Sequence, residues 1–201
     1  TDIFSKSRAV NTLSAARLFL FGARDVWFVV ALPVYLSTAF GWLHWQVGGF
    51  LALWIIAYGM VQALAPRLTT ARDGSVPDGA AAFRWALPLS ATPAVIALAL
   101  GVGAAPQLVL LAGLLLFGTL FAVNSSLHSF LIVSYAQEDG VSLDVGFYYM
   151  ANAMGRLLGT VLSGWVYQAH GLEACLWLSA IFLGISATLS LGLPRGGPGR
   201  G

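Results

Sequence analysis

Six long apolar stretches, separated by short breaks, dominate this chain of 201 residues. Crossing the hydrocarbon core of a bilayer takes about 20 apolar residues in a helix. We expect membrane-spanning helices near residues 14–40, 45–65, 85–104, 107–135, 145–168 and 173–193. Only 9% of the residues are charged and the mean hydropathy is +0.81, whereas a soluble domain carries about 25% charged residues. The sequence therefore predicts an all-α membrane protein, a six-transmembrane-helix bundle.

The basic residues outside these stretches predict the orientation of the bundle. They all fall on one side of the six-span arrangement: Lys6, Arg8, Arg67, Arg72, Arg84, Arg195 and Arg200. The connections on the other side contain neither Lys nor Arg, so the positive-inside rule places both termini in the cytoplasm. Acidic residues weigh little in this rule, and the fourth connection contains three of them: Glu138, Asp139 and Asp144. We expect a multi-pass protein of a bacterial inner membrane, with a cytoplasmic linker at 1–13, the transmembrane domain at 14–194 and a flexible cytoplasmic tail at 195–201.

Small residues recur at every fourth position in the last two spans. Such ladders let neighbouring helices approach closely, and we interpret both as packing surfaces. The first comprises Ala151, Gly155, Gly159 and Ser163, and the second Ala180, Gly184, Thr188 and Gly192. Trp27 and Trp54 do not fit an interfacial belt, and we favour helix packing over cavity lining for both. The single cysteine, Cys175, is predicted to be a small buried hydrophobe.

Ionisable residues within the spans are the strongest sign of function, because each costs about 2.5 to 3.5 kcal/mol on insertion and usually faces water, a partner helix or a ligand. Arg24 and Asp25 are consecutive, so their side chains point about 100° apart and we do not expect them to pair with each other. Interhelical salt bridges that lock the bundle are the structural alternative for both. For Arg17, near the cytoplasmic end, we favour a side chain that extends to the headgroups. We expect Arg156 to serve function, with pairing to Asp25 or Asp144 as the alternative.

Polar side chains accompany these charges. Tyr148, Asn152 and Arg156 are four residues apart and share one helix face, which we expect opposite the first ladder. The fourth span contains a polar run that comprises Asn124, Ser125, Ser126 and His128. The candidate substrate-binding residues are Arg17, Arg24, Asn124, Tyr148, Asn152 and Arg156. Asp25 and His128 are candidates for proton coupling, although a histidine such as His128 is more typical of hydrogen-bonded packing.

Three arginines against one well-embedded carboxylate indicate an anionic cargo, because guanidinium binds carboxylate and phosphate in a bidentate manner and stays charged. The sequence contains no GxxxxGK, HExxH or GxSxG motif. Ser126 and His128 share one span and point to different sides, so intramembrane hydrolysis is a remote alternative. We predict a secondary transporter with no catalytic residue, cofactor or metal. The scattered basic residues form no stripe suited to nucleic acid.

Three segments of the chain are similar to a known transporter family. They read ARLFLFGARDVWFVVALPVYL, YGMVQALAPRL and NSSLHSFLIVSYAQEDGVSLDVGFYYMANAMGRLLGTVLSGWVYQ. From Ser14 to Pro194 the chain resembles the ArsJ-type organoarsenical efflux branch of the major facilitator superfamily (MFS). Such transporters have two six-helix halves that hold substrate near the midplane. The resemblance covers the C-terminal half of an MFS fold, and it implies a partner: a missing N-terminal half, a second subunit or a second copy.

The resemblance also implies a cargo, 1-arseno-3-phosphoglycerate, which a glyceraldehyde-3-phosphate dehydrogenase makes when it uses arsenate in place of phosphate. Export of this compound would contribute to arsenate resistance. Its carboxylate, phosphate and arsenate groups agree with the arginines of the spans. The alternative is an MFS half for another small solute, such as a drug, a sugar or an organic anion, driven by protons.

Overall fold

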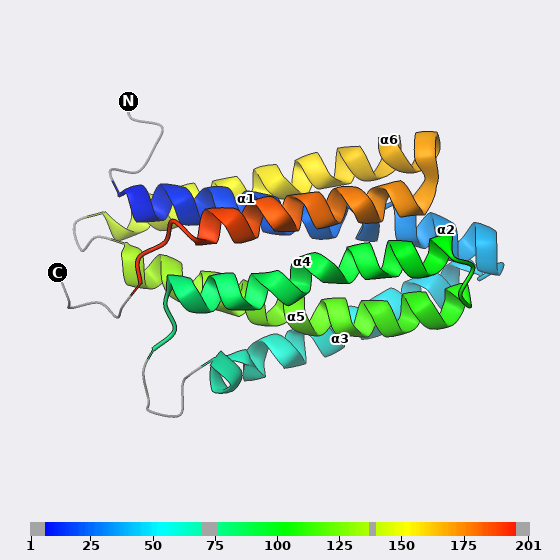
Figure 1. The fold of residues 1–201 in the computed structure, drawn as a ribbon, viewed down its shortest axis with the longest axis horizontal. Helices are drawn as coiled ribbons and strands as arrows, with labels where there is room; N and C mark the ends of the chain where they lie inside the picture. The colour runs from blue at the N-terminus through cyan, green and yellow to red at the C-terminus, as the bar shows by residue number, and fades with distance from the viewer. Residues whose placement is uncertain (1–6, 70–75, 137–139, 196–201) are drawn as a thin grey trace.

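The computed structural model describes residues 7–69, 76–136 and 140–195, and the regular elements in these ranges are all helical. The helices are α1 (Arg8–Phe28), α2 (Ala31–Phe40), α3 (His44–Thr69), α4 (Gly79–Gly101), α5 (Pro106–Tyr135) and α6 (Val141–Ser190). They form an elongated bundle (Figure 1). Five helical segments are long and apolar enough to cross a membrane, with α1 and α2 counted together as Arg8–Phe40. At this level the predicted all-α membrane bundle is confirmed.

Helix α6 is too long for a single crossing. Its 50 residues would extend about 75 Å at 1.5 Å per residue, whereas a bilayer core is about 30 Å thick. Gly171 interrupts the helix with a φ of 76° and a ψ of −173°, a backbone conformation in which glycine is not strained. Figure 1 shows the chain folding back within α6. Helix α6 therefore consists of two arms, residues 141–170 and 172–190.

The first predicted span is interrupted between α1 and α2. Pro33 has no amide hydrogen, so the carbonyl of Val29 loses its usual helical partner. The hydroxyl oxygen of Ser163, in the first arm of α6, accepts hydrogen bonds from the amides of Val30 at 3.3 Å and Ala31 at 3.1 Å. The N-cap residue of α2, Val30, makes no side-chain cap hydrogen bond. Ser163 takes this role from another helix and satisfies the free amides at the start of α2.

Two helices begin before their predicted spans because polar residues cap them. Ser7 caps α1, and the Asp78 carboxylate accepts hydrogen bonds from the amides of Ala80 and Ala81 at the start of α4. As a result α1 begins at residue 8 rather than 14, and α4 at residue 79 rather than 85. Both caps lie in polar segments, which a hydropathy criterion assigns to loops.

The first small-residue ladder packs α6 directly against α1, so this prediction is confirmed. A Cβ atom added at Gly155 would collide with the backbone carbonyl of Leu18. A Cβ atom at Gly159 would lie 2.6 Å from the carbonyl oxygen of Gly22. The absence of side chains at these two glycines is what lets the two backbones touch.

The second ladder was predicted to pack in the same way, but within the described residues it does not do so along its length, although a Cβ atom at Gly192 would lie 3.6 Å from Cγ2 of Thr12. A Cβ atom at Gly184 would meet nothing within 4 Å, and Thr188 is exposed. The arm at 172–190 packs through a neighbouring stripe that comprises Ser179, Phe182, Leu183, Ser186, Ala187 and Ser190. Spacing alone identifies a smooth helix face but does not say whether another helix covers it.

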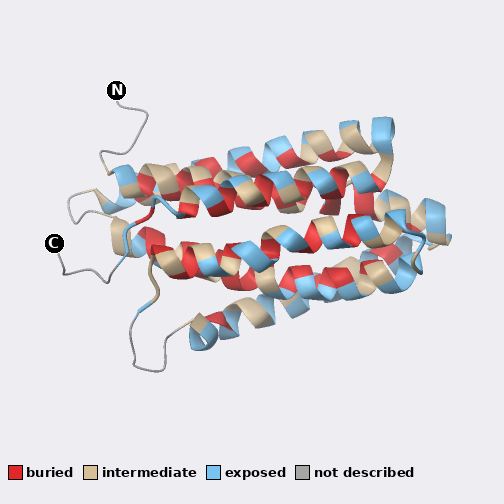
Figure 2. Cartoon of the chain, in the orientation of Figure 1, coloured by how far each residue is buried: buried red, intermediate tan, exposed pale blue. Residues whose placement is uncertain are grey.

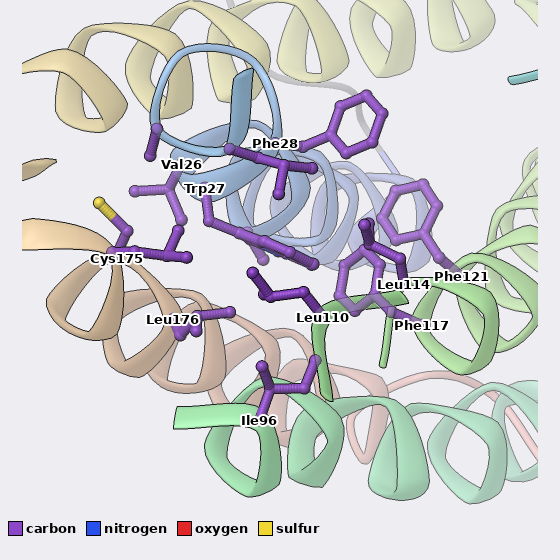
Figure 3. Close-up of a cluster of buried hydrophobic side chains, with 14 of the residues drawn as sticks. Val26, Trp27, Phe28, Ile96, Leu110, Leu114, Phe117, Phe121, Cys175 and Leu176 are labelled. Carbon is purple, nitrogen blue, oxygen red and sulfur yellow. The ribbon is translucent and has the colours of Figure 1, made fainter. Parts of the chain in front are cut away.

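Aromatic and aliphatic side chains from all six helices form the main core, and Figure 3 shows part of it. Trp27 is fully buried and packs edge-on against Phe117, with ring centroids 5.1 Å apart. The Nε1 of Trp54 donates a hydrogen bond of 3.0 Å to the carbonyl of Leu114. The predicted packing role is confirmed for Trp27, whereas Trp54 both packs against α5 and lines a cavity between α3 and α5. Cys175 is a buried free cysteine as expected.

Helix α3 has the most open surface of the bundle. Its buried residues are Val47, Trp54 and Ala65, and its outer side exposes Leu53, Ile55, Ile56, Met60, Leu64 and Leu68. Figure 2 shows exposed residues along much of this helix. An apolar surface of this extent requires cover by lipid or by another protein.

The start of α1 and the end of α6 lie at the same end of the bundle (Figure 1). The amide of Gly79, where α4 begins, donates a hydrogen bond of 3.1 Å to the carbonyl of Pro194 at this end. The described basic residues outside the long apolar stretches belong to the helix ends on this side: Arg8, Arg67, Arg84 and Arg195. Of the residues used to predict orientation, Lys6, Arg72, Glu138, Asp139 and Arg200 lie outside the described residues.

Candidate functional site

The carboxylate of Asp25, in α1, accepts hydrogen bonds from two arginines. The Nε of Arg24 lies 2.6 Å from Oδ1, and the Nε of Arg156 lies 3.2 Å from Oδ2. We refer to Arg24, Asp25 and Arg156 as the Asp25 cluster. Because Arg156 belongs to the first arm of α6, the cluster joins two helices. The interhelical salt bridge weighed as the structural alternative is therefore present.

The expectation that Arg24 and Asp25 do not pair was wrong. Their Cα–Cβ directions diverge by about 100° on a helix, but the guanidinium group is carried on a long flexible stem that can bend sideways. The Cζ atom of Arg24 lies 4.9 Å from the ring centroid of Phe21 and 5.4 Å from that of Phe121. These cation–π contacts hold the guanidinium beside the carboxylate.

The members of the Asp25 cluster differ in exposure. The side chain of Asp25 is 1% exposed, that of Arg24 14% and that of Arg156 56%. Arg156 lies 15 residues after the start of α6, about 22 Å along the helix. Asp25 lies 17 residues after the start of α1, about 25 Å along that helix. Arg156 therefore presents a charge on the outside of this chain near the middle of the first arm of α6, an apolar helix long enough to cross a membrane.

Arg17 is buried, and its predicted extension to the headgroups is wrong. Its Nε donates a hydrogen bond of 2.9 Å to Oδ1 of Asn152. Its Nη1 donates to the carbonyl and hydroxyl oxygens of Ser125 at 3.1 and 3.2 Å. The guanidinium also lies over the rings of Phe21 and Tyr148, at 4.0 and 5.1 Å from Cζ to the centroids. Neutral partners from α5 and α6 thus surround a fixed positive charge.

The stripe formed by Tyr148, Asn152 and Arg156 was expected opposite the first ladder, but it lies beside it. Tyr148 and Asn152 contact Arg17, and Arg156 contacts Asp25. All three therefore reach α1, the helix against which the ladder packs. Asn152 and Arg156 directly follow the ladder residues Ala151 and Gly155. One residue turns the helix by only about 100°, so the stripe and the ladder are neighbouring faces.

The structure does not join the remaining candidates from α5 to the Asp25 cluster. Asn124 donates hydrogen bonds of 2.9 Å from Nδ2 to the carbonyls of Trp85 and Leu120, which fastens α5 to α4. His128 is buried, and its Nδ1 has no hydrogen-bond partner among the described residues. Neither residue contacts Arg24, Asp25 or Arg156 through an interaction of the described residues.

Two residues of the site were not among the predicted binding residues. Ser125 holds Arg17, and Phe21 lies between both α1 arginines and contacts each guanidinium. The spacing contained a signal for Phe21, since it follows Arg17 by four positions and precedes Arg24 by three, which places all three on one side of a helix. No comparable signal distinguished Ser125 from the adjacent Ser126.

Three cavities lined by described residues lie away from the arginines. One of about 520 Å³ is lined by Trp42, Trp45, Gln46, Gly49, Phe50 and Leu53. One of about 360 Å³ lies at the fold-back of α6 and is lined by residues that include Tyr35, His170 and Glu173. The third, of about 120 Å³, lies between α3 and α5. Arg24, Asp25 and Arg156 line none of these three cavities.

Within the described ranges, no group of three or more His, Cys, Asp or Glu side chains is arranged to hold a metal ion. No family model matches the chain, and no curated protein matches it.

Proposed function

We propose that this chain is one half of a membrane transporter of the major facilitator type, and that it exports an organic anion together with a second six-helix unit. The observation that carries the proposal is an excess of arginine over carboxylate: Asp25 pairs with two arginines, Arg24 and Arg156, and a third, Arg17, is buried nearby on α1 with neutral partners only. Among the described residues, Asp25 is the one acidic side chain in hydrogen-bond contact with any of these three arginines.

The charge balance favours an anionic ligand. One carboxylate compensates one positive charge, so an excess of positive charge is left at mid-bilayer depth. Water or a ligand must balance such an excess, because an isolated charge in hydrocarbon is strongly unfavourable. Guanidinium groups pair with carboxylate and phosphate in fixed, bidentate geometry, which suits a small organic anion.

The proposed architecture has six crossings, formed by α1 with α2, then α3, α4, α5 and the two arms of α6. The exposed guanidinium of Arg156 and the apolar surface of α3 then face a second unit, which is either a separate N-terminal half, another subunit or a second copy of this chain. With the basic end of the bundle in the cytoplasm, as the positive-inside rule predicts, both termini are cytoplasmic and the membrane is the bacterial inner membrane.

The proposed cargo is 1-arseno-3-phosphoglycerate, and this choice rests on the resemblance to the ArsJ-type efflux branch. The compound carries carboxylate, phosphate and arsenate groups, each an oxyanion that arginine recognises. Export of an anion from a cell with a negative interior is also favoured by about 2.3 kcal/mol per charge per 100 mV of membrane potential.

Arsenate resistance provides the test. Cells lacking their own arsenical exporters should gain resistance when they express the chain with its second unit and a glyceraldehyde-3-phosphate dehydrogenase. Inside-out vesicles from these cells should accumulate the arsenical made by the dehydrogenase. Arg156→Gln should abolish uptake, whereas Arg84→Gln, which removes a charge from an exposed side chain near the start of α4, should leave it intact. Equal uptake by both variants, at equal amounts of inserted protein, would refute the proposed role of the cluster.

A further inference from the structure

We infer that Asp25 is a resident counter-ion that the anionic group of the cargo displaces from Arg156. In this scheme Arg156 alternates between Asp25 and the cargo, while Arg24 stays with Asp25 throughout. The inference rests on the proposed function, since it assumes that an anion binds at the Asp25 cluster. It adds how the site binds this anion and which arginine contacts it.

The two hydrogen bonds of Asp25 are unequal, which sets the order of exchange. The Arg24 bond uses Oδ1 and is 2.6 Å long, whereas the Arg156 bond uses Oδ2 and is 3.2 Å long. Loss of the longer bond leaves the buried carboxylate still paired with Arg24. Because a buried charge is costly mainly when it loses every partner, the release of Arg156 is the less costly of the two separations.

Arg156 is also the one arginine of the three that has room to move. Its side chain is 56% exposed, whereas Arg24 is flanked by Phe21 and Phe121 and is 14% exposed. Arg17 is fixed by hydrogen bonds to Asn152 and Ser125. An incoming anion can therefore recruit Arg156 without dismantling the packing around the other two.

The geometry of the Arg156 bond leaves an oxyanion-binding edge available. Asp25 engages Nε of Arg156 at a single oxygen, so the two Nη groups are not part of this contact. A pair of parallel N–H groups is the arrangement that binds two oxygens of a phosphate, arsenate or carboxylate. The anion can thus bind first at the outer edge of Arg156 and then take over the interaction with Nε.

The depth of Arg156 separates a soluble anion from a lipid headgroup. The residue lies about 22 Å along α6 from its start, so headgroup phosphates at that end are far from it. The residue therefore meets phosphate or carboxylate only where water enters the bundle. This identifies the ligand class as a soluble oxyanion and not an anionic phospholipid.

The test measures binding of inorganic phosphate to the full chain in phosphatidylcholine nanodiscs, by calorimetry and by NMR of the arginine Nε–H groups. Asp25→Asn removes the competing charge and keeps the side-chain size, and it should tighten phosphate binding about fivefold, the equivalent of about 1 kcal/mol for a partly exposed ion pair. Arg156→Gln should weaken binding and should also cancel the gain when combined with Asp25→Asn. In the wild-type chain, phosphate should shift the Nε–H signal of Arg156 and leave that of Arg24 in place.

The outcomes separate this inference from the proposed function. If Arg156→Gln weakens binding but Asp25→Asn does not tighten it, and the Nε–H signal of Arg156 stays constant, an anion site exists and the exchange is refuted. If neither variant alters binding, the anion site itself is refuted. If anionic lipid in the nanodiscs shifts the Arg156 signal as phosphate does, the ligand is a headgroup and the inference is overturned. The NMR signals are read in the wild-type chain, so the test stands even if Asp25→Asn fails to fold.

Discussion

Arg156 and Asp25 are separated by 131 positions in the sequence, and a hydrogen bond of 3.2 Å joins Nε of the first to Oδ2 of the second. The same stretch of interface contains the contact of Gly159 with Gly22, where two backbones touch. The ion pair therefore lies beside the tightest packing in the bundle. Its geometry is set by that packing, because neither backbone can shift without a collision.

Gly155→Ala should destabilise the chain by about 1 to 3 kcal/mol, because the added methyl group would collide with the Leu18 carbonyl and overpacking carries a cost of this size. Gly164→Ala is the matched control on the same arm, since a Cβ atom at Gly164 meets nothing within 4 Å. Unfolding in mixed detergent micelles, followed by circular dichroism, measures the difference. Equal stability of the two variants would show that the α1–α6 contact is looser than described.

Arg17→Lys should lower stability by about 2 to 3 kcal/mol, even though it conserves charge. The planar guanidinium bonds Asn152 and Ser125 at once, and a lysine cannot reproduce this fork, which leaves buried polar groups without partners. Arg8→Lys, on an exposed side chain at the start of α1, serves as the control and should be neutral. Thermal denaturation in detergent is the measurement, and a neutral Arg17→Lys would favour the headgroup position that the sequence predicted.

Ser163→Ala should weaken the junction between α1 and α2. The variant removes the oxygen that accepts hydrogen bonds from Val30 and Ala31, at a cost of about 1 to 2 kcal/mol, as for the loss of a helix cap. Amide hydrogen exchange at these two residues should become faster, while exchange elsewhere in α1 stays unchanged. Ser134→Ala, which removes a hydroxyl bonded only within α5, should leave both amides protected.

Cysteine labelling in whole cells tests the six crossings. In a Cys175→Ala background, a cysteine at Trp45, which is exposed near the start of α3, should react with an impermeant maleimide added outside. A cysteine at Arg84 should react only after the cells are permeabilised, because it lies at the opposite end of the bundle. Native Cys175 should stay unlabelled in the folded chain, since it is buried. Outside labelling at position 84 would reverse the proposed orientation.

The sequence was sufficient to predict the arrangement of helices along the chain. Hydropathy identified the apolar segments, and the short polar break around Gly171 correctly separated two arms that the structure contains within α6. Helix ends were less accurate, because capping by Ser7 and Asp78 extends helices into polar segments. The interruption between α1 and α2 was missed, since it depends on Pro33 and on Ser163 from a distant span.

The candidate site was predictable in its residue types and less so in its contacts. The arginines of the spans and Asp25 were singled out by their cost within lipid, and the structure brings Arg24, Asp25 and Arg156 into contact. Their partners depended on information that a single helix does not contain. Arg17 finds Ser125 and Asn152 on two other helices, and Arg24 turns toward its neighbour because aromatic rings flank it. Helix periodicity predicts the helix face on which a residue lies. It does not predict where the end group of a long side chain such as arginine is placed.

The backbone contact of Gly155 with Leu18 has a mechanical consequence. At Gly155 and Gly159 no side chain separates α1 from the first arm of α6, so at these points there are no rotamers that can rearrange to let one helix slide along the other. The two must travel as a rigid body, bearing Arg17, Arg24 and Arg156 together. Any opening and closing of a passage would then occur at helix interfaces with ordinary side-chain packing. Helix α3 is held by few buried residues, so it is the helix of this chain with the most freedom to move.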